Sequence, residues 1–380
     1  MAEVTNYIDR LVAELCPDGV EYRPLSDVVE KNYGGGTPSK AKEEYWGGDI
    51  PWASVGDLSN DLMEVLDTRS KITPAGVSGS STNVVPAGAV IVAIKIAPGK
   101  MKIAGVDLAI NQDIRGLVLN DLMNARFLTY YFRTLRFAGH GTIVKSITNK
   151  RLMDTEVPVP PLEIQAAIVE ILDKFTNLEA ELEAELEART LQYEYYRDSL
   201  FEALDCPRVP LDSFAKIKNG KTYKDFGAGN IPVYGSGGIM TYVDRSSYDK
   251  PTVLIPRKGS LGNLFYLEEP FWNVDTIFYT EIDEEQVIPK FLYYFLKTAH
   301  LEDLNTAGGV PSLTQKVLNK VLIPVPSLEE QQRIVDILDR FDALTSSLSE
   351  GLPAELAARR SQYEYYRDQL LTFPRKGDNQ

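Results

Sequence analysis

Hydrophobic residues recur at helical spacing in the middle of the chain. Between Glu163 and Phe175 the apolar side chains follow i, i+3 and i+4 spacing, which predicts an amphipathic helix. The next segment, from residue 178, reads LEAE-LEAE-LEAR and consists of strong helix formers. Leu186, Tyr193 and Leu200 then recur every seven residues, the period of a coiled-coil seam. We therefore expect a long helix with one buried stripe.

The same pattern returns near the C-terminus. Leu356, Tyr363 and Leu370 again recur every seven residues. Gly351 and Pro353 interrupt this second helical segment near its middle, and proline removes a helical hydrogen bond. We therefore expect a kink or a restart of the helix there.

The two larger segments between the helices have a mixed pattern. Short apolar runs at 90–94 and 252–255 predict buried strands, and 127–135 and 291–297 predict short helices. The remainder is rich in glycine and predicts loops and strands. Each large segment is therefore expected to fold as a compact α/β unit.

Two strings occur twice in the same order, which indicates a duplication. QYEYYRD stands at 192–198 and 362–368, and PVPPLEIQAAIVEILDKF at 158–175 matches PVPSLEEQQRIVDILDRF at 324–341. The predicted organisation is an N-terminal helical segment (1–21), a variable domain (22–157), a helical region (158–206), a second variable domain (207–323) and a second helical region (324–380).

The variable domains also match each other, more faintly. The matched pairs are Pro24-Leu25 with Pro210-Leu211, Ile50-Pro51 with Ile231-Pro232, Asn111 and Asp113 with Asn273 and Asp275, Phe127-Leu128 with Phe291-Leu292, and 146–148 with 312–314. The framework repeats while the loops differ, so the copies are expected to bind two different things in the same mode. Tyr7, Asp9, Leu11 and Leu15 also match Tyr196, Asp198, Leu200 and Leu204, which predicts a cyclic order and a closed object with approximate two-fold symmetry.

Composition narrows the class of protein. The 380 residues are 44% hydrophobic and 25% charged, as in a globular chain. Two cysteines, Cys16 and Cys206, cannot build a disulfide framework. The longest apolar stretch, at 87–94, is too short to span a membrane, and no signal peptide is visible. We expect a protein of the reducing cytoplasm.

The net charge of −14 is unevenly distributed. The variable domain at 22–157 carries 16 basic and 14 acidic residues, and the one at 207–323 carries 13 of each. The excess of acid lies in the helical segments, with a net charge of −9 at 158–206. The global charge therefore does not exclude binding of nucleic acid, which requires clustered lysine and arginine.

Motifs of catalysis are missing from the sequence. Gly220-Lys221-Thr222 resembles the end of a phosphate loop, but the required glycine five residues earlier is Ala215. The run at 34–36 is three glycines and predicts a mobile loop. With two histidines, no HExxH, GxSxG or GxGxxG string and acid concentrated on helices, the sequence predicts a non-catalytic protein without a metal or cofactor of its own.

The motifs QYEYYRD and PLEIQAAIVEILDKF, the N-terminal CPDGVEYRPL and the duplicated order resemble the specificity subunit of type I restriction-modification systems. The resemblance covers essentially the whole chain. It implies an α/β (α+β) protein with two duplicated mixed target-recognition domains separated by an antiparallel pair of long coiled-coil helices. Each domain would read one half of a bipartite target in double-stranded DNA.

The resemblance also implies partners. Two methyltransferase subunits would dock on a non-catalytic specificity subunit, and restriction subunits would join them in the full complex. S-adenosylmethionine, ATP and Mg would be bound by those partners, and no membrane is involved. The strongly acidic helix at 158–206 is a departure that argues against its direct contact with DNA.

Candidate DNA-binding residues are polar and basic side chains in the glycine-rich loops, each of which has a solvated loop residue as its alternative interpretation. They are Thr37, Ser39, Lys40, Lys95, Lys100, Lys102 and Lys145 in the first domain, and Lys218, Lys221, Tyr223, Tyr234, Ser236, Arg257 and Lys258 in the second. Tyr193 and Tyr363 are expected to pack in the helical seam, whereas Tyr195 and Tyr365 fall off it and are candidates for partner binding. Two other hypotheses remain: a non-catalytic coiled-coil scaffold whose domains bind proteins or sugars, and an enzyme with an unrecognised site.

Overall fold

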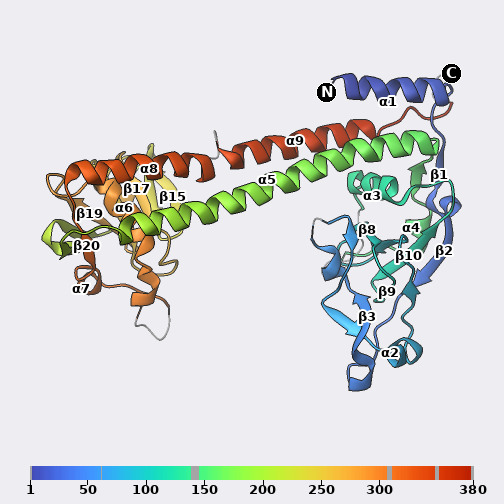
Figure 1. Ribbon diagram of the computed structural model, residues 1–380, viewed down its shortest axis with the longest axis horizontal. Coiled ribbons are helices and arrows are strands. Elements are labelled where there is room, and N and C mark those ends of the chain that lie inside the picture. Colours follow the sequence, from blue (N-terminus) through green and yellow to red (C-terminus); the bar gives the residue numbers. More distant parts are fainter. Residues whose placement is uncertain (1, 61, 138–144, 306–309, 347–350, 378–380) are drawn as a thin grey trace. The chain divides into compact units, whose positions relative to one another are not determined.

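One helix, α5 (Leu162–Glu202), passes from one folded unit of the chain into the other. Figure 1 shows the computed structural model, which describes residues 2–60, 62–137, 145–305, 310–346 and 351–377. Unit 1 comprises Met1–Ala180 and Ala358–Gln380, and unit 2 comprises Glu181–Ala357. The expected long helix is therefore continuous over both the apolar stripe and the LEAE repeats.

Unit 1 contains two mixed sheets and a short strand pair. The five-stranded sheet has the order β2 (Val29–Gly34), β10 (Ile114–Leu119), β7 (Val90–Ala93), β8 (Met101–Ala104) and β4 (Glu64–Val65). The four-stranded sheet has the order β5 (Ser70–Ile72), β3 (Trp46–Ala53), β9 (Leu108–Ile110) and β6 (Val84–Val85), and β1 (Tyr22–Pro24) pairs with β11 (Glu156–Pro158). Strand β7 is buried along its whole length, as its apolar run predicts.

Unit 2 repeats this arrangement with fewer strands. One sheet has the order β13 (Ala215–Asn219), β19 (Ile277–Ile282), β16 (Thr252–Pro256) and β17 (Phe265–Leu267). The other has the order β15 (Gly238–Val243), β14 (Ile231–Gly235) and β18 (Trp272–Asn273), and β12 (Arg208–Pro210) pairs with β20 (Leu322–Pro324). Each unit has one parallel strand pair in its smaller sheet, β3 with β9 in unit 1 and β14 with β18 in unit 2. The other strand pairs of these two sheets are antiparallel. The repeated framework expected from the sequence is thus present in both units.

The short helices repeat as well. Helix α3 (Ala125–Thr134) buries Phe127 and Leu128, and α6 (Pro289–Thr298) buries Phe291 and Leu292. The remaining short helices are α2 (Pro74–Ser78), α4 (Asn149–Met153), α7 (Gln315–Leu318), and the 3-10 helices η1 (Leu25–Val28), η2 (Glu43–Tyr45), η3 (Val55–Leu58), η4 (Leu211–Ser213) and η5 (Leu301–Leu304).

The second helical region is broken where proline and glycine predicted a restart. Helix α8 (Leu328–Ser346) ends before this point and α9 (Leu352–Leu370) begins after it, and residues 347–350 lie outside the described residues. Pro353 stands in the first turn of α9, where its missing N–H costs no helical hydrogen bond.

In each QYEYYRD motif, at least one tyrosine packs against an aromatic residue of the same unit. In unit 1, Phe175 of α5 stacks on Tyr366 of α9 at 5.9 Å between ring centroids, and Arg360 pairs with Glu179 at 2.6 Å. This order of contacts makes the two helical segments of unit 1 antiparallel. In unit 2, Tyr193 of α5 is 5% exposed and lies 6.4 Å from Phe341 of α8, so its predicted seam packing is confirmed.

A buried glutamine joins the framework of each variable domain to the helix that follows it. Gln165 of α5 accepts a hydrogen bond from the backbone N–H of Asn124 and donates to the carbonyls of Leu122 and Pro160, all at 2.8 Å. Gln331 of α8 makes the same three kinds of bond in unit 2. Both side chains are fully buried, and all the hydrogen bonds keep a polar group satisfied inside an apolar core.

A tyrosine–aspartate pair forms a second join in each unit. The hydroxyl of Tyr130 on α3 donates to Asp173 of α5 at 2.6 Å, and Arg126 pairs with the same carboxylate at 2.8 Å. In unit 2 the Tyr294 hydroxyl on α6 donates to Asp339 of α8 at 2.5 Å. These bonds fix the aromatic helix of each framework on the helix that follows it.

Helix α1 and the segment that follows α9 lie together in unit 1. Ile8 and Val12 of helix α1 (Ala2–Leu15) belong to one core cluster with Leu370, the last residue of α9, and Phe373. Figure 1 shows α1 beside the end of α9. The backbone N–H of Val20 donates to the Pro374 carbonyl at 2.8 Å. This contact agrees with the cyclic order expected from the sequence.

The glycine run at 34–36 has a packing role. A Cβ at Gly35 would lie 1.8 Å from the carbonyl oxygen of Asn111, and one at Gly36 would lie 2.2 Å from Ser81. The glycines let two chain segments approach closely, so the expectation of a mobile loop is replaced by a tightly packed crossing. Among the described residues, no helix is both long enough and apolar enough to cross a membrane.

Candidate nucleic-acid interface

Three predicted lysines of the first domain meet around the loop between β7 and β8. Lys95 and Lys100 stand on this loop, which the strand pairing closes as a hairpin. The N–H of Ile96 donates to the carbonyl of Lys145 at 2.8 Å, and Lys95 forms a β-bridge with Ser146. Lys95, Lys100 and Lys145 are all exposed. The structure thus collects cations that are fifty residues apart in sequence.

A chain of polar contacts connects this loop to Thr37. Lys95 pairs with Asp113 at 2.9 Å, and the Gln112 amide donates to the same carboxylate at 3.2 Å. The Thr37 hydroxyl donates to the Gln112 side chain. Ser39 and Lys40 are exposed in the segment that follows Thr37. The two groups of candidates in the first domain therefore belong to one connected surface.

Lys102 is not exposed on that surface, although it lines a hollow with Lys100 and Lys145. It is 2% exposed in strand β8, and its ammonium donates to the Asn60 side chain and to the Leu62 carbonyl. A buried ammonium that is satisfied by protein oxygens cannot reach a phosphate without breaking those bonds. The assignment of Lys102 to the DNA-facing set is therefore corrected to a role in holding Asn60 and Leu62 against the sheet.

Two arginines near the loop were missed by the sequence analysis. Arg133, in the last turn of α3, and Arg136 line the same hollow as Lys100 and Lys145, and no acidic residue among those that the structure describes lines it. Their basic character was visible, but only the packing of α3 against β8 shows that they face the β7–β8 loop. Within the described parts of the chain, no group of three or more histidine, cysteine, aspartate or glutamate residues is placed to hold a metal ion.

In the second domain, three candidates gather around Thr276. The backbone N–H groups of Arg257 and Lys258 donate to the Thr276 carbonyl at 2.8 and 3.2 Å, and the Ser236 N–H donates to its hydroxyl at 3.2 Å. The Arg257 guanidinium lies over the Phe278 ring at 5.9 Å, which fixes its direction. Lys258 is exposed.

The other candidates of the second domain take part in contacts that stabilise the domain itself. Lys221 is exposed, and its carbonyl accepts a hydrogen bond from the Trp272 indole at 2.9 Å, while the half-buried Tyr223 packs beside the Val233 cluster. Lys218 pairs with Glu281 of the neighbouring strand at 3.1 Å. Tyr234 packs 5.5 Å from Phe265, and burial raises the pKa of its hydroxyl.

An apolar surface in the second domain had no counterpart among the sequence candidates. Ile239, Met240 and Tyr242 of strand β15 are each at least half exposed. Large exposed apolar side chains on one short strand are typical of contact surfaces. Composition gave no signal for them, because only the pairing of β14 with β15 shows that this strand lies at a sheet edge.

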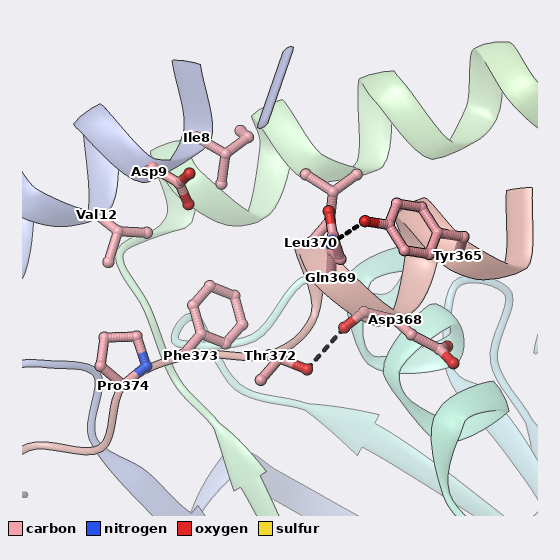
Figure 2. Close-up of a pocket in the computed structure, with 10 residues that line it drawn as sticks. All are labelled: Ile8, Asp9, Val12, Tyr365, Asp368, Gln369, Leu370, Thr372, Phe373 and Pro374. Atoms are coloured by element: carbon pink, nitrogen blue, oxygen red, sulfur yellow. Dashed lines mark hydrogen bonds between the residues drawn. The ribbon is translucent and has the colours of Figure 1, made fainter. Parts of the chain in front are cut away.

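The two helix tyrosines expected to face a partner are both exposed. Tyr195 is 69% exposed and Tyr365 is 59% exposed. Figure 2 shows Tyr365 beside a hollow formed by α1 and the end of α9, where the Gln369 amide donates to its hydroxyl at 2.7 Å. The hollow is lined on the α1 side by Ile8, Asp9 and Val12.

Comparison with known proteins agrees with the duplicated architecture. The chain matches the family described as the type I restriction modification DNA specificity domain over residues 17–188 and 205–358, one match for each repeat. It is 30% identical to a putative type I restriction enzyme specificity subunit of Haemophilus influenzae, over 93% of this chain and 96% of that protein. It is 31% identical to the EcoprrI specificity subunit of Escherichia coli, over 92% and 93% of the two chains.

Solved structures share the fold. A chain from a structure of type I restriction-modification complex assembly superposes with a TM-score of 0.67 at 18% identity, covering 95% of this chain and 98% of that one. The S subunit from M. genitalium gives a TM-score of 0.55 at 19% identity, covering 93% and 96%. These matches confirm the predicted fold class and a non-catalytic specificity subunit, and they do not favour a scaffold for proteins or sugars. The chain belongs to the family of type I restriction-modification specificity subunits.

Proposed function

We propose that this chain selects the DNA target of a type I restriction-modification complex, with the first recognition domain (22–157) reading one half of a bipartite sequence and the second (207–323) reading the other. The observation that carries this proposal is the repetition of one framework with different loops. The hairpin loop after β7 and the one after β16 occupy the same place, yet one reads KIAPGK and the other KGSLGN. The same mode of binding with different loop chemistry suits two different half-sites.

In the first domain, the proposed DNA-facing residues are those connected through the β7–β8 loop. Lys95, Lys100 and Lys145 provide charge for phosphates, and Thr37, Ser39 and Lys40 extend the surface. Arg133 and Arg136 join this set because they line the hollow with Lys100 and Lys145. Lys102 is omitted because it is buried.

In the second domain, Lys258, Arg257 and Ser236 form the centre of the proposed surface. Their backbone is held on Thr276, so their side chains start from fixed positions. The proposal extends to Lys221 and Tyr223 in the neighbouring loop. Lys218 and Tyr234 complete it with support from their sheet contacts.

The helices are proposed to dock two methyltransferase subunits. QYEYYRD is identical in the two copies, unlike the recognition loops, and two identical partners require two identical surfaces. Tyr195 and Tyr365 are the exposed aromatic members of those surfaces. The methyltransferase subunits would bind S-adenosylmethionine, and restriction subunits with ATP and Mg would complete the complex in the cytoplasm.

The test is single-molecule methylome sequencing of cells with the methyltransferase gene, in the presence and absence of this chain. We expect one bipartite methylated motif, with two short specified halves and an unspecified spacer, only when the chain is present. A continuous motif, or methylation that is independent of the chain, would contradict the proposal. In the same cells, Lys145→Ala is expected to reduce the extent of methylation without changing the motif, because phosphate contacts carry no sequence information.

A further inference from the structure

One exposed residue of the β7–β8 loop has an unusual backbone. Ile96 has a φ of +68°, and only one other described residue that is not glycine, His300, has a positive φ. The Ala97 N–H donates to the Lys95 carbonyl at 2.8 Å, so Ile96 is the centre of a tight three-residue turn. Such a φ is an outlier for a β-branched residue, because Cβ meets the neighbouring carbonyl.

The second recognition domain shows what this position requires. Gly259 N–H donates to the Pro311 carbonyl at 3.0 Å, as Ile96 N–H donates to that of Lys145 at 2.8 Å, so the two residues are equivalent. The bridges of Lys95 with Ser146 and of Lys258 with Ser312 confirm the correspondence. Gly259 has a φ of +82°, which glycine adopts without strain. Both copies therefore use a left-handed residue here, and only the first places a side chain on it.

The surroundings hold Ile96 in this conformation. Gly99, three residues on, donates to the Ala93 carbonyl at 2.9 Å and packs so closely on Phe137 that a Cβ there would lie 2.0 Å from the ring. The loop is thus clamped on both sides of the turn. Strain that is maintained by its surroundings is typical of functional positions.

Packing of the Ile96 side chain does little to offset the strain of its backbone. The side chain is 62% exposed and lines one hollow together with Lys100, Lys145 and Arg136. A surface that combines several cations with one projecting aliphatic group is suited to DNA, where phosphates meet the cations and an apolar side chain meets a base or its methyl group.

We propose that Ile96 is a specificity-determining residue that contacts a base of the half-site read by the first recognition domain. This inference rests on the proposed function. The strained turn directs an aliphatic side chain between phosphate-binding lysines, and the second domain, with Gly259, makes no such contact.

The test uses two substitutions that relieve the strain and remove the apolar group. Ile96→Gly reproduces the second domain, and Ile96→Asn retains a side chain of a type that tolerates a positive φ. Each full-length variant is combined with the methyltransferase, and methylation rates are measured on duplexes carrying every single base change in either half-site. Thermal unfolding of each variant is measured alongside.

We expect the two readouts to move in opposite directions. The unfolding temperature of both variants should equal or exceed that of the unaltered chain, while discrimination at one base pair of the first half-site should fall by about tenfold. Discrimination in the second half-site should be unchanged. As a matched control, Leu322→Thr trims an exposed apolar side chain of strand β20 and should alter neither half.

The inference is overturned if both variants fold and discriminate in the first half-site as the unaltered chain does, or if both half-sites are affected equally. Failure of the proposed function has a different signature, because the unaltered chain would then direct no bipartite methylation. Gly259→Ala serves as a check on the geometry. It should lower the unfolding temperature, because alanine at this φ is strained.

Discussion

Two tyrosine hydroxyls of unit 2 should make opposite contributions to stability. Tyr294 donates to the Asp339 carboxylate at 2.5 Å, and burial together with this carboxylate raises the pKa of Tyr294, so the hydroxyl keeps its proton. The Tyr193 hydroxyl is also buried, but among the described residues it has no hydrogen-bond partner. Tyr294→Phe and Tyr193→Phe remove the same atom from these two environments.

The magnitudes follow from the contacts. A hydrogen bond to a charged group contributes about 1.5–3 kcal/mol. Asp339 keeps its pairing with Lys290 at 2.8 Å, so Tyr294→Phe should lower the free energy of unfolding by about 2 kcal/mol. Tyr193→Phe removes an unsatisfied buried hydroxyl, so the free energy of unfolding should stay unchanged or rise by up to about 1 kcal/mol. For a unit of this size, about 2 kcal/mol corresponds to a fall in unfolding temperature of about 4–8 °C.

The assay is urea and thermal unfolding of the full chain, followed by circular dichroism, for the two variants in parallel. A Tyr193→Phe variant that loses as much stability as Tyr294→Phe would refute the reasoning, because it would give the Tyr193 hydroxyl a partner. The duplication supplies a second trial in unit 1. There the Tyr130 hydroxyl binds Asp173, whereas that of Tyr363 is buried without a partner among the described residues.

Three further predictions concern the hydrogen bonds of Gln331, the affinity of the chain for DNA and the length of the spacer between the half-sites. Gln331→Met should lower the free energy of unfolding by about 3 kcal/mol, at about 1 kcal/mol for each of the three lost hydrogen bonds, and a loss below about 1 kcal/mol in urea unfolding would contradict it. The chain alone should bind its DNA far more weakly than with the methyltransferase at ~0.15 M salt, because its recognition domains are nearly neutral, and equal nanomolar affinity in a fluorescence titration would count against this. Deleting Leu182–Glu185 removes about 6 Å of helical rise and should shorten the spacer of the methylated motif by about one or two base pairs, and full methylation with an unchanged spacer would exclude a role of α5 in setting that distance.

Features that depend on neighbouring residues in sequence could be predicted. The stripe at 163–175 and the LEAE repeats specify α5 locally, and Pro353 marks where α9 restarts. The duplication also allowed framework residues to be predicted, because a residue that is matched in both copies, such as Asn111 with Asn273, belongs to the common framework. Both asparagines are indeed buried.

Features that depend on the packing of segments far apart in the sequence could not be predicted. The sequence predicts Lys102 at the surface, because its sequence neighbours do not show that Asn60 and Leu62 bring oxygens to its ammonium. The connection from Thr37 to Lys95 passes through Gln112 and Asp113, which lie on a third segment. Arg136 likewise joins the site only through the position of α3.

The central claim is that each recognition domain reads its own half of the target. It is tested most directly by replacing residues 22–157 with the corresponding domain of another specificity subunit and sequencing the methylome of cells that carry the chimera and its methyltransferase. The paired strands β1 and β11 hold the two ends of this segment side by side, so an exchange at these points leaves the helices intact. The account predicts a methylated motif with one new half and one unchanged half, and a motif altered in both halves would contradict it.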